Sequence, residues 1–169
     1  MEYTFRKATI ADLGQIWSIL EDAIARRKAD GSEQWQDGYP NPSVIANDIA
    51  LGHGFVMLED DTIIGYTALL ISNEPAYAAI EGKWLTDDEF VVFHRVAIDG
   101  KNLGRGLAKH MLAFIEQYAL KHGIYSIKAD TNFDNQAMLR IFEREGYQYC
   151  GEVYFRGSAR QAFEKVIVH

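Results

Sequence analysis

A strongly apolar run that passes directly into a glycine-rich turn constrains the fold of this chain more than any other segment. The run, Phe90–Ile98, predicts a strand that is largely buried on both faces. The turn follows, and apolar residues at helical spacing then predict a helix over 104–122. A further strand is predicted over 124–129. Because a crossover helix joins neighbouring strands in parallel, this region predicts a parallel βαβ unit.

The remaining segments predict antiparallel strands and shorter helices around this unit. Thr9 and Asp12 have the spacing of a capping box that opens a helix, and Asn41-Pro42 opens a second one. The predicted elements are a strand over 3–6, the two helices just described, the second ending near residue 51, strands over 55–58 and 62–71 joined by Asp60-Asp61, an irregular segment over 72–88, a helix capped by Asp134 and ended by Gly146, and strands over 147–155 and 162–168. The fold class is therefore α/β (α+β), a mixed and mostly antiparallel sheet of about seven strands with helices on both faces.

Composition narrows the class of protein further. The 169 residues, 48% of them hydrophobic, predict one domain over 1–169 with a single core. A net charge of -7 argues against nonspecific nucleic-acid binding, which needs a basic surface. Cys150 is the only cysteine, so neither an internal disulfide nor a cysteine-rich metal site is predicted. Because the first residues lack a signal-peptide pattern and no run is long enough to span a membrane, we expect a cytoplasmic protein with no membrane partner.

The turn after Ile98 carries the chemistry. The first N–H groups of a helix have no internal partner and lie at the positive end of its dipole, and glycines let a phosphate approach the backbone. Lys101 and Arg105 add positive charge beside Gly104 and Gly106. The turn is not a P-loop, because no Gly-Lys-Ser/Thr follows, and it is only half of a dinucleotide fingerprint. A tight turn without a ligand and a phosphate site are both compatible with this pattern.

The same residues resemble the GCN5-related N-acetyltransferase (GNAT) family. Lys101-Asn102-Leu103-Gly104-Arg105-Gly106 is similar to the family's Gln/Arg-x-x-Gly-x-Gly/Ala turn, with lysine in the first position, and the resemblance continues through 134–138 and 142–147. It implies an acyl-CoA N-acyltransferase fold and acetyl-CoA as cosubstrate, without a metal. It also implies that the coenzyme contacts Val96, Ile98, Lys101, Leu103, Gly104, Arg105, Gly106, Leu107, Asn132, Asn135 and Phe142. For Asn132 and Asn135, local capping is an equally open interpretation.

Acetyl transfer to an amine needs a base for the amine and a proton for the leaving thiolate. Alternation along the strand predicts that Val92, His94, Val96 and Ile98 share one face, so His94 is the candidate base, with Glu89 as a second candidate. A core histidine bonded to a carbonyl is the alternative for His94. The family's acid is a tyrosine at the position of Phe142, which cannot donate a proton. Tyr147 is therefore a candidate acid, with Tyr154 or water as alternatives.

The amine acceptor is the least constrained part of the sequence. By resemblance to the family, Trp35, Tyr39 and Trp84 lie in loops that shape the acceptor site, although core packing explains them equally well. The resemblance also implies a possible homodimer. Two other functions stay open: an acyl-CoA-binding module without catalysis, suggested by Phe142, and an NAD(P)-binding oxidoreductase, suggested by the Gly-x-Gly turn.

Overall fold

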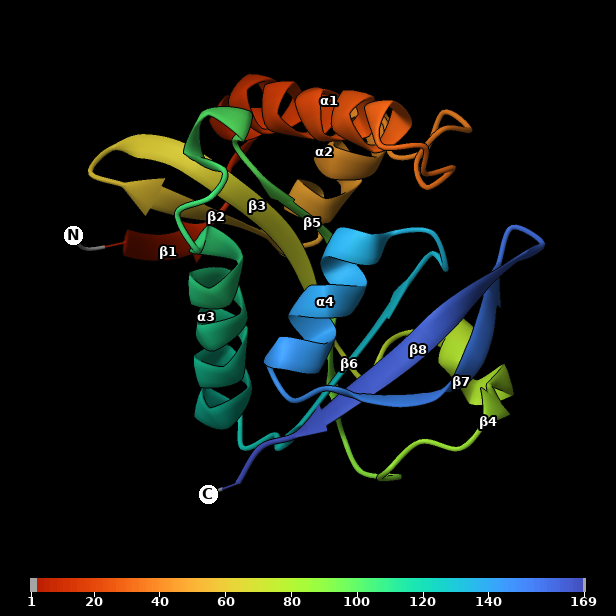
Figure 1. Ribbon diagram of the computed structural model, residues 1–169. Helices are drawn as coiled ribbons and strands as arrows, with labels where there is room; N and C mark the ends of the chain where they lie inside the picture. The colour runs from red at the N-terminus through yellow and green to blue at the C-terminus, as the bar shows by residue number, and fades with distance from the viewer. Residues whose placement is uncertain (1–2, 169) are drawn as a thin grey trace. The chain divides into compact units, whose positions relative to one another are not determined.

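Figure 1 labels strands β3 (Thr62–Ile71) and β5 (Val91–Ile98). Each of these strands begins in one structural unit of the chain and ends in another. A computed structural model describes residues 3–168. The first unit holds the residues up to Leu69 together with His94–Met111, and the second holds Leu70–Phe93 and the residues from Leu112 onward. Each unit has a cluster of buried apolar side chains of its own.

The strands of the first unit follow the order β1-β2-β3-β5, where β1 is Tyr3–Lys7 and β2 is Gly54–Glu59. β1 pairs with β2 and β2 pairs with β3, both antiparallel. The predicted hairpin through Asp60-Asp61 is confirmed, since Glu59 lies opposite Thr62 in the register. This hairpin brings Tyr66 opposite Val56, and both side chains are fully buried.

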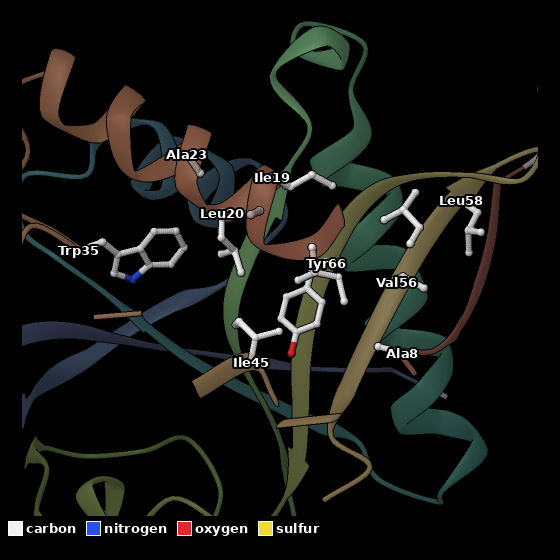
Figure 2. Packing of buried hydrophobic residues seen from close by; sticks show 12 residues of the cluster. Ala8, Ile19, Leu20, Ala23, Trp35, Ile45, Val56, Leu58 and Tyr66 are labelled. Atoms are coloured by element: carbon white, nitrogen blue, oxygen red, sulfur yellow. The ribbon is translucent and has the colours of Figure 1, made fainter. Parts of the chain in front are cut away.

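Two helices cover this part of the sheet. α1 (Leu13–Ala29) follows a single 3-10 turn, η1 (Ile10–Asp12), and α2 is Pro42–Ala50. The predicted cap of α2 is confirmed, because the Asn41 side chain accepts a 3.1 Å hydrogen bond from the Val44 N–H. Apolar residues of both helices and of the strands interdigitate in the cluster that Figure 2 shows, which includes Ile16, Ile19, Leu20, Ala23, Trp35, Ile45, Val56, Leu58 and Tyr66.

Asp12 ties the start of α1 to β1. Its carboxylate accepts hydrogen bonds of 2.7 and 3.1 Å from the Arg6 guanidinium and one of 2.8 Å from the Thr9 N–H, which completes the predicted capping box. The hydrogen bonds from Arg6 lower the pKa of Asp12 from 3.8 to about 2. The folded protein therefore keeps this carboxylate ionised at pH values where the unfolded chain protonates it.

Asp12→Asn is expected to lower the free energy of unfolding by about 1 kcal/mol at neutral pH, because Arg6 is partly exposed and solvent screens the pair. The folded pKa lies below the unfolded one, so the contribution of Asp12 is complete above about pH 5 and is lost progressively as the pH falls toward 2. Urea denaturation of the wild type and the variant at pH 7 and pH 2.5 measures the difference. A gap between the two proteins that stays constant with pH would contradict the assignment.

The strands of the second unit follow the order β3-β5-β6-β8-β7-β4. The parallel pairing of β5 with β6 is confirmed, with Val91 opposite Ile127 and Val92 opposite Lys128. The pairs made by β8 with β6 and β7, and by β4 with β7, are antiparallel. The strands that this unit adds are β4 (Glu81–Gly82), β6 (Ser126–Thr131), β7 (Gln148–Phe155) and β8 (Ser158–Val166).

The structure confirms the predicted mixed, mostly antiparallel sheet and corrects several details. Residues 3–168 contain eight strands rather than about seven, because the segment over 72–88 forms β4 and a 3-10 turn, η2 (Pro75–Ala79). α3 is Leu107–Lys121, so it begins after the glycines rather than at Gly104. α4 is Gln136–Arg144, and its cap is Asn135 rather than the predicted Asp134. Within the described residues, no helix has the length and apolar character needed to cross a membrane.

Candidate active site

The glycine-rich turn lies directly before α3 in the first unit. A short 3-10 turn, η3 (Gly100–Asn102), leads into it, and α3 starts at Leu107. Gly104 and Gly106 have φ values of +83° and +72°, which residues other than glycine rarely adopt. A Cβ atom added to either glycine would meet no protein atom within 4 Å. The backbone at the start of α3 therefore borders open space, as an anion site at a helix N-terminus requires.

The two predicted countercharges differ in their surroundings. Arg105 forms an ion pair with Glu59, in which Nη2 lies 2.6 Å from Oε2, and it also donates hydrogen bonds to the Tyr3 hydroxyl and the Asn102 side chain. The Arg105 guanidinium holds the pKa of Glu59 below its ordinary value. Lys101 is exposed beside the same turn. Lys101 is therefore an exposed positive charge at the turn, whereas the Arg105 charge is paired with Glu59.

A cavity of about 640 Å³ lies between α1 and the first residues of the turn. Arg26 of α1 donates a 3.0 Å hydrogen bond to the Ile98 carbonyl and is paired with Asp22. Gly100 packs so closely here that a Cβ atom would lie 2.3 Å from an Asp22 carboxylate oxygen. The cavity is lined by Gln15, Ser18, Ile19, Asp22, Arg26, Ile63, Asp99, Gly100, Lys101 and Leu103.

The cavity therefore brings together two of the predicted coenzyme contacts, Lys101 and Leu103. A third predicted coenzyme contact is Ile98, and its carbonyl accepts the hydrogen bond from Arg26. A fourth, Leu107, is only 2% exposed as a whole residue at the first position of α3.

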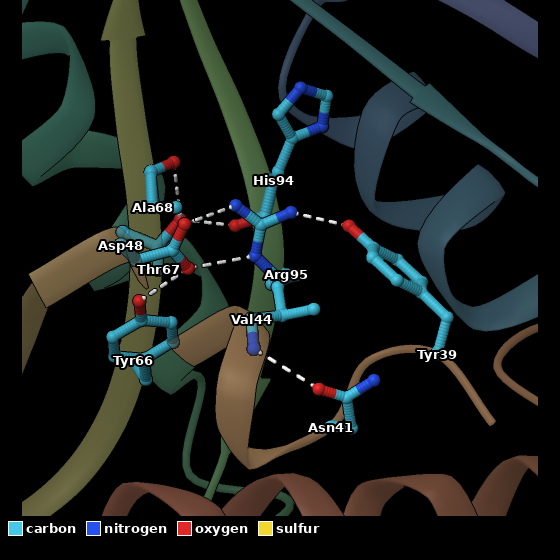
Figure 3. Close-up of polar contacts among 9 residues, drawn as sticks. All are labelled: Tyr39, Asn41, Val44, Asp48, Tyr66, Thr67, Ala68, His94 and Arg95. Atoms are coloured by element: carbon cyan, nitrogen blue, oxygen red, sulfur yellow. Dashed lines mark hydrogen bonds and ion pairs between the residues drawn. The ribbon is translucent and has the colours of Figure 1, made fainter. Parts of the chain in front are cut away.

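Strand β5 is irregular at Arg95, which has a φ of +56° in the left-handed region. The predicted alternation over residues 92–98 is wrong at this point, because a left-handed residue interrupts the extended backbone. Figure 3 shows that the side chains of His94 and Arg95 leave the strand in different directions. His94 and Val96 are each half-buried, and the His94 carbonyl accepts a 3.2 Å hydrogen bond from the Thr67 hydroxyl.

A buried ion pair fixes Arg95. Its Nη2 and Nε lie 2.6 and 2.9 Å from the two carboxylate oxygens of Asp48 on α2, and both side chains are at most 10% exposed. The Tyr66 hydroxyl donates a 2.8 Å hydrogen bond to the same carboxylate, and Arg95 donates to the Tyr39 hydroxyl (Figure 3). Burial, aided by the negative charge of Asp48, raises the pKa of Tyr66 well above its ordinary value. Four side chains from α2, β3, β5 and the loop before α2 thus form one polar network.

Sequence analysis missed Asp48, Tyr66 and Arg95 as a group. A signal existed, because Asp48 occupies the apolar face of a short helix and Arg95 interrupts an apolar strand. Of the predicted acceptor residues, Tyr39 belongs to this network and is half-buried. Trp35 is 6% exposed in the core of the first unit, with the Arg27 guanidinium 3.9 Å from its ring centre.

The candidate acid lies in an aromatic cluster of the second unit. Phe142 is fully buried, and its ring centre lies 5.1 Å from that of Tyr147 and 4.6 Å from that of Phe163. The Tyr147 hydroxyl is buried and has no hydrogen-bond partner within residues 3–168, and burial raises its pKa far above the ordinary value. In this structure Phe142 offers no exposed surface to a ligand. The proposed roles of Phe142 and Tyr147 stay predictions.

The other predicted residues of the second unit have local roles in the structure. The Asn135 side chain caps α4 by accepting a 3.2 Å hydrogen bond from the Met138 N–H, and Asn132 is hydrogen-bonded to Asp134. Glu89 is exposed in the segment before β5. Trp84 is half-buried, and its Nε1 donates a 2.9 Å hydrogen bond to the Tyr77 carbonyl. Residues 3–168 contain no group of three or more His, Cys, Asp or Glu side chains that could hold a metal ion.

The site thus consists of an open glycine-rich turn at the start of α3, next to the irregular strand β5 of a mixed sheet. Residues 17–147 match the model of the acetyltransferase (GNAT) family, and the chain belongs to this family. The family predicted from the turn motif is thereby confirmed.

Individual relatives support the same assignment. A GNAT-family acetyltransferase of Streptococcus agalactiae is 37% identical, with a TM-score of 0.89 over 99% of this chain and 96% of that one. The uncharacterized N-acetyltransferase YesJ of Bacillus subtilis is 28% identical over 165 residues, which are 95% of this chain and 88% of YesJ. The protein yncA of Salmonella typhimurium, solved with its cofactor acetyl-CoA, shares the fold at 16% identity, with a TM-score of 0.67 over 100% of this chain and 96% of that one.

Proposed function

We propose that the chain transfers an acetyl group from acetyl-CoA to the primary amine of a small molecule, a peptide N-terminus or a lysine. The observation that carries this proposal is the open backbone at Gly104 and Gly106 before α3, in a chain of the acetyltransferase family. Backbone amides from Leu103 to Leu107 would hold the pyrophosphate, and Lys101 would add charge. The thioester would then lie along the second half of β5, where Val96 is half-buried.

The reaction is a direct attack within a ternary complex. The amine nitrogen forms a bond to the thioester carbon, the carbon–sulfur bond breaks, and the proton lost by the amine ends on the thiolate of CoA. His94 on β5 is the proposed base, with Glu89 as the second candidate. Since Phe142 cannot donate a proton, the thiolate receives one from water or from Tyr147.

Calorimetric titration with acetyl-CoA, CoA and NADH in parallel tests the proposal. Selective binding of CoA and acetyl-CoA, followed by thiol release with an amine from a panel, is the expected result. Binding of CoA without thiol release for any amine would favour an acyl-CoA-binding module, an alternative that Phe142 suggests. Selective binding of NADH would favour an oxidoreductase. If none of the three bound, the proposed function would be overturned.

His94→Gln is expected to lower kcat/KM about a hundredfold near neutral pH and to leave the acetyl-CoA affinity unchanged, because a base acts on the amine and not on the coenzyme. The loss should shrink at high pH, where more of the amine is already neutral. His122→Gln is the matched control, since His122 is exposed at the end of α3. Equal pH profiles for the His94 variant and the wild type would return His94 to a structural role.

We also propose that the protein is cytoplasmic and that it can form a homodimer. Its proposed partners are amines rather than nucleic acids. The one cysteine, Cys150, is a buried free thiol, which suits a reducing compartment. The net charge of -7 suits a cationic amine better than a polyanion. Fractionation of expressing cells tests the location, and size-exclusion chromatography tests the dimer. A DNA titration tests whether the protein binds nucleic acid.

A further inference from the structure

The glycine-rich turn lies outside regular secondary structure, so contacts at its two ends determine its shape. Residues 103–106, between η3 and α3, belong to neither a helix nor a strand. A segment with two glycines has many accessible conformations, and ordering it costs conformational entropy. A turn that is already ordered before a ligand arrives avoids this cost at the moment of binding. The residues that hold the turn therefore bear on its affinity for a coenzyme.

Arg105 holds the end of the turn that leads into α3. Its guanidinium forms the ion pair with Glu59 of β2 and donates a 3.3 Å hydrogen bond to the Tyr3 hydroxyl of β1. Arg105 also donates a hydrogen bond to the side chain of Asn102, on the other side of Gly104. This end of the turn is therefore fixed to two strands of the first unit.

Arg26, in the last turn of α1, holds the end of the turn that follows β5. Its Nη2 donates the 3.0 Å hydrogen bond to the carbonyl of Ile98, the last residue of β5, and its Nη1 is paired with Asp22. The next residue, Asp99, donates a 2.8 Å hydrogen bond from its N–H to the Ile64 carbonyl of β3. Two successive residues are thus fixed, one by the side chain of Arg26 and the other by the backbone of β3.

Gly100 shows how closely the pair of Asp22 and Arg26 approaches the turn. A Cβ atom at Gly100 would lie 2.8 Å from the Arg26 Nη1 and still nearer to the Asp22 carboxylate. The φ of Gly100 lies outside the left-handed region, so this close approach, and not the backbone conformation, requires a glycine. A methyl group at this position would displace the ends of both side chains. The ion pair therefore packs directly against the first residue of η3.

We propose that Arg26 is a positioning residue for the coenzyme turn. Its hydrogen bond fixes the Ile98 carbonyl, and Asp22 orients the guanidinium for that hydrogen bond. The backbone amides that follow are thereby ordered before a pyrophosphate binds, which raises the affinity without any contact between Arg26 and the coenzyme. All residues of this arrangement belong to the first unit. The inference rests on the proposed function, because it takes the turn to be the site of coenzyme A.

Arg26→Met tests the inference by steady-state kinetics and by calorimetric titration with CoA. We expect the KM for acetyl-CoA and the Kd for CoA to rise about tenfold, while kcat and the KM for the amine stay unchanged. A residue that only stabilises the fold would not separate the two substrates in this way. Lys28→Met is the matched control, because Lys28 is exposed in the same last turn of α1 and also loses one positive charge. Its KM for acetyl-CoA should equal that of the wild type.

The salt dependence distinguishes positioning from a direct contact between Arg26 and a coenzyme phosphate. Ile98 is only 8% exposed, so its hydrogen bond with Arg26 is little screened by salt. The ratio of the CoA affinities of the wild type and Arg26→Met should therefore be the same at low salt and at about 0.5 M salt. A ratio that falls to one at high salt would show a direct charge contact and would overturn the positioning role.

Gly100→Ala tests the same contact without removing a charge. Its methyl group would displace the Asp22 carboxylate and the Arg26 guanidinium, so we expect a similar loss of CoA affinity, about tenfold. The double variant of Arg26→Met and Gly100→Ala should lose no more than either single variant, because both changes disrupt one arrangement. Losses that add in the double variant would contradict the inference. If Arg26→Met fails to fold in urea denaturation experiments, Gly100→Ala carries the test alone.

The outcomes separate this inference from the proposed function. If the wild type binds CoA and Arg26→Met binds it equally well, the positioning role is wrong and the transferase stands. If the wild type does not bind CoA, the proposed function is itself overturned. A loss of kcat with an unchanged KM for acetyl-CoA in Arg26→Met would also contradict the inference, since it would place the effect on the reaction and not on the coenzyme turn.

Discussion

Gly104→Val is expected to weaken acetyl-CoA binding by about a hundredfold or more. At a φ of +83° a β-branched residue strains the backbone by about 1 to 2 kcal/mol. The larger effect comes from position, because the added side chain would project into the open space beside the start of α3. A phosphate there would lose about two charge-assisted hydrogen bonds from backbone amides, each worth about 1.5 to 3 kcal/mol. Calorimetric titration with CoA measures the loss.

Gly123→Val is the matched control for this change. Gly123 follows α3, has a φ of +69°, and also borders open space. It therefore carries the same backbone strain without a place in the turn. We expect Gly123→Val to lose stability in urea denaturation and to keep its affinity for CoA. Equal CoA affinities for the wild type and Gly104→Val would remove the turn from the proposed coenzyme site.

The parts of the fold that sequence predicted are those that neighbouring residues determine. The apolar run before Gly100 and the helical spacing after it predicted β5, α3 and the parallel pairing with β6. Strand β4 was missed because it has two residues and depends on β7, where Gly82 lies opposite Gly151. A Cβ at Gly82 would lie 2.2 Å from the Cys150 carbonyl oxygen, so this pairing needs a contact that no local pattern contains.

The residues of the candidate site were likewise predictable only where they are neighbours in the sequence. The turn at Gly104 was predictable because its glycines and its place between strand and helix are adjacent in sequence. The pair of Asp48 and Arg95 joins residues far apart in the chain, and a left-handed arginine has no signature in a sequence. Lys128 was missed because its strand was predicted from the apolar residues around it. A lysine within such a strand was the available signal for a buried charge on β6, where Lys128 is 4% exposed.

Asp48→Ala is expected to lower the free energy of unfolding by about 3 to 5 kcal/mol. The change leaves the Arg95 guanidinium buried without its carboxylate, and the cost of an uncompensated buried charge exceeds the worth of the pair itself. The Tyr66 hydroxyl also loses its acceptor. Urea denaturation of Asp48→Ala, Arg95→Met and the double variant forms a cycle that isolates the interaction. We expect the double variant to be less destabilised than the sum of the single variants.

A second pair of variants, Asp48→Asn and Tyr66→Phe, tests whether the ion pair also positions β5. Asp48 forms its ion pair with Arg95, which directly follows His94 and is the one left-handed residue of β5. If this ion pair stabilises the irregular form of the strand, Asp48→Asn should lower turnover more than acetyl-CoA affinity, because the turn at Gly104 is unchanged. Tyr66→Phe is the matched control, since it removes one hydrogen bond to Asp48, costs about 1 kcal/mol of stability, and leaves the ion pair with Arg95 intact. Turnover that falls equally in Asp48→Asn and Tyr66→Phe would show that stability alone, and not the shape of β5, links this network to the reaction.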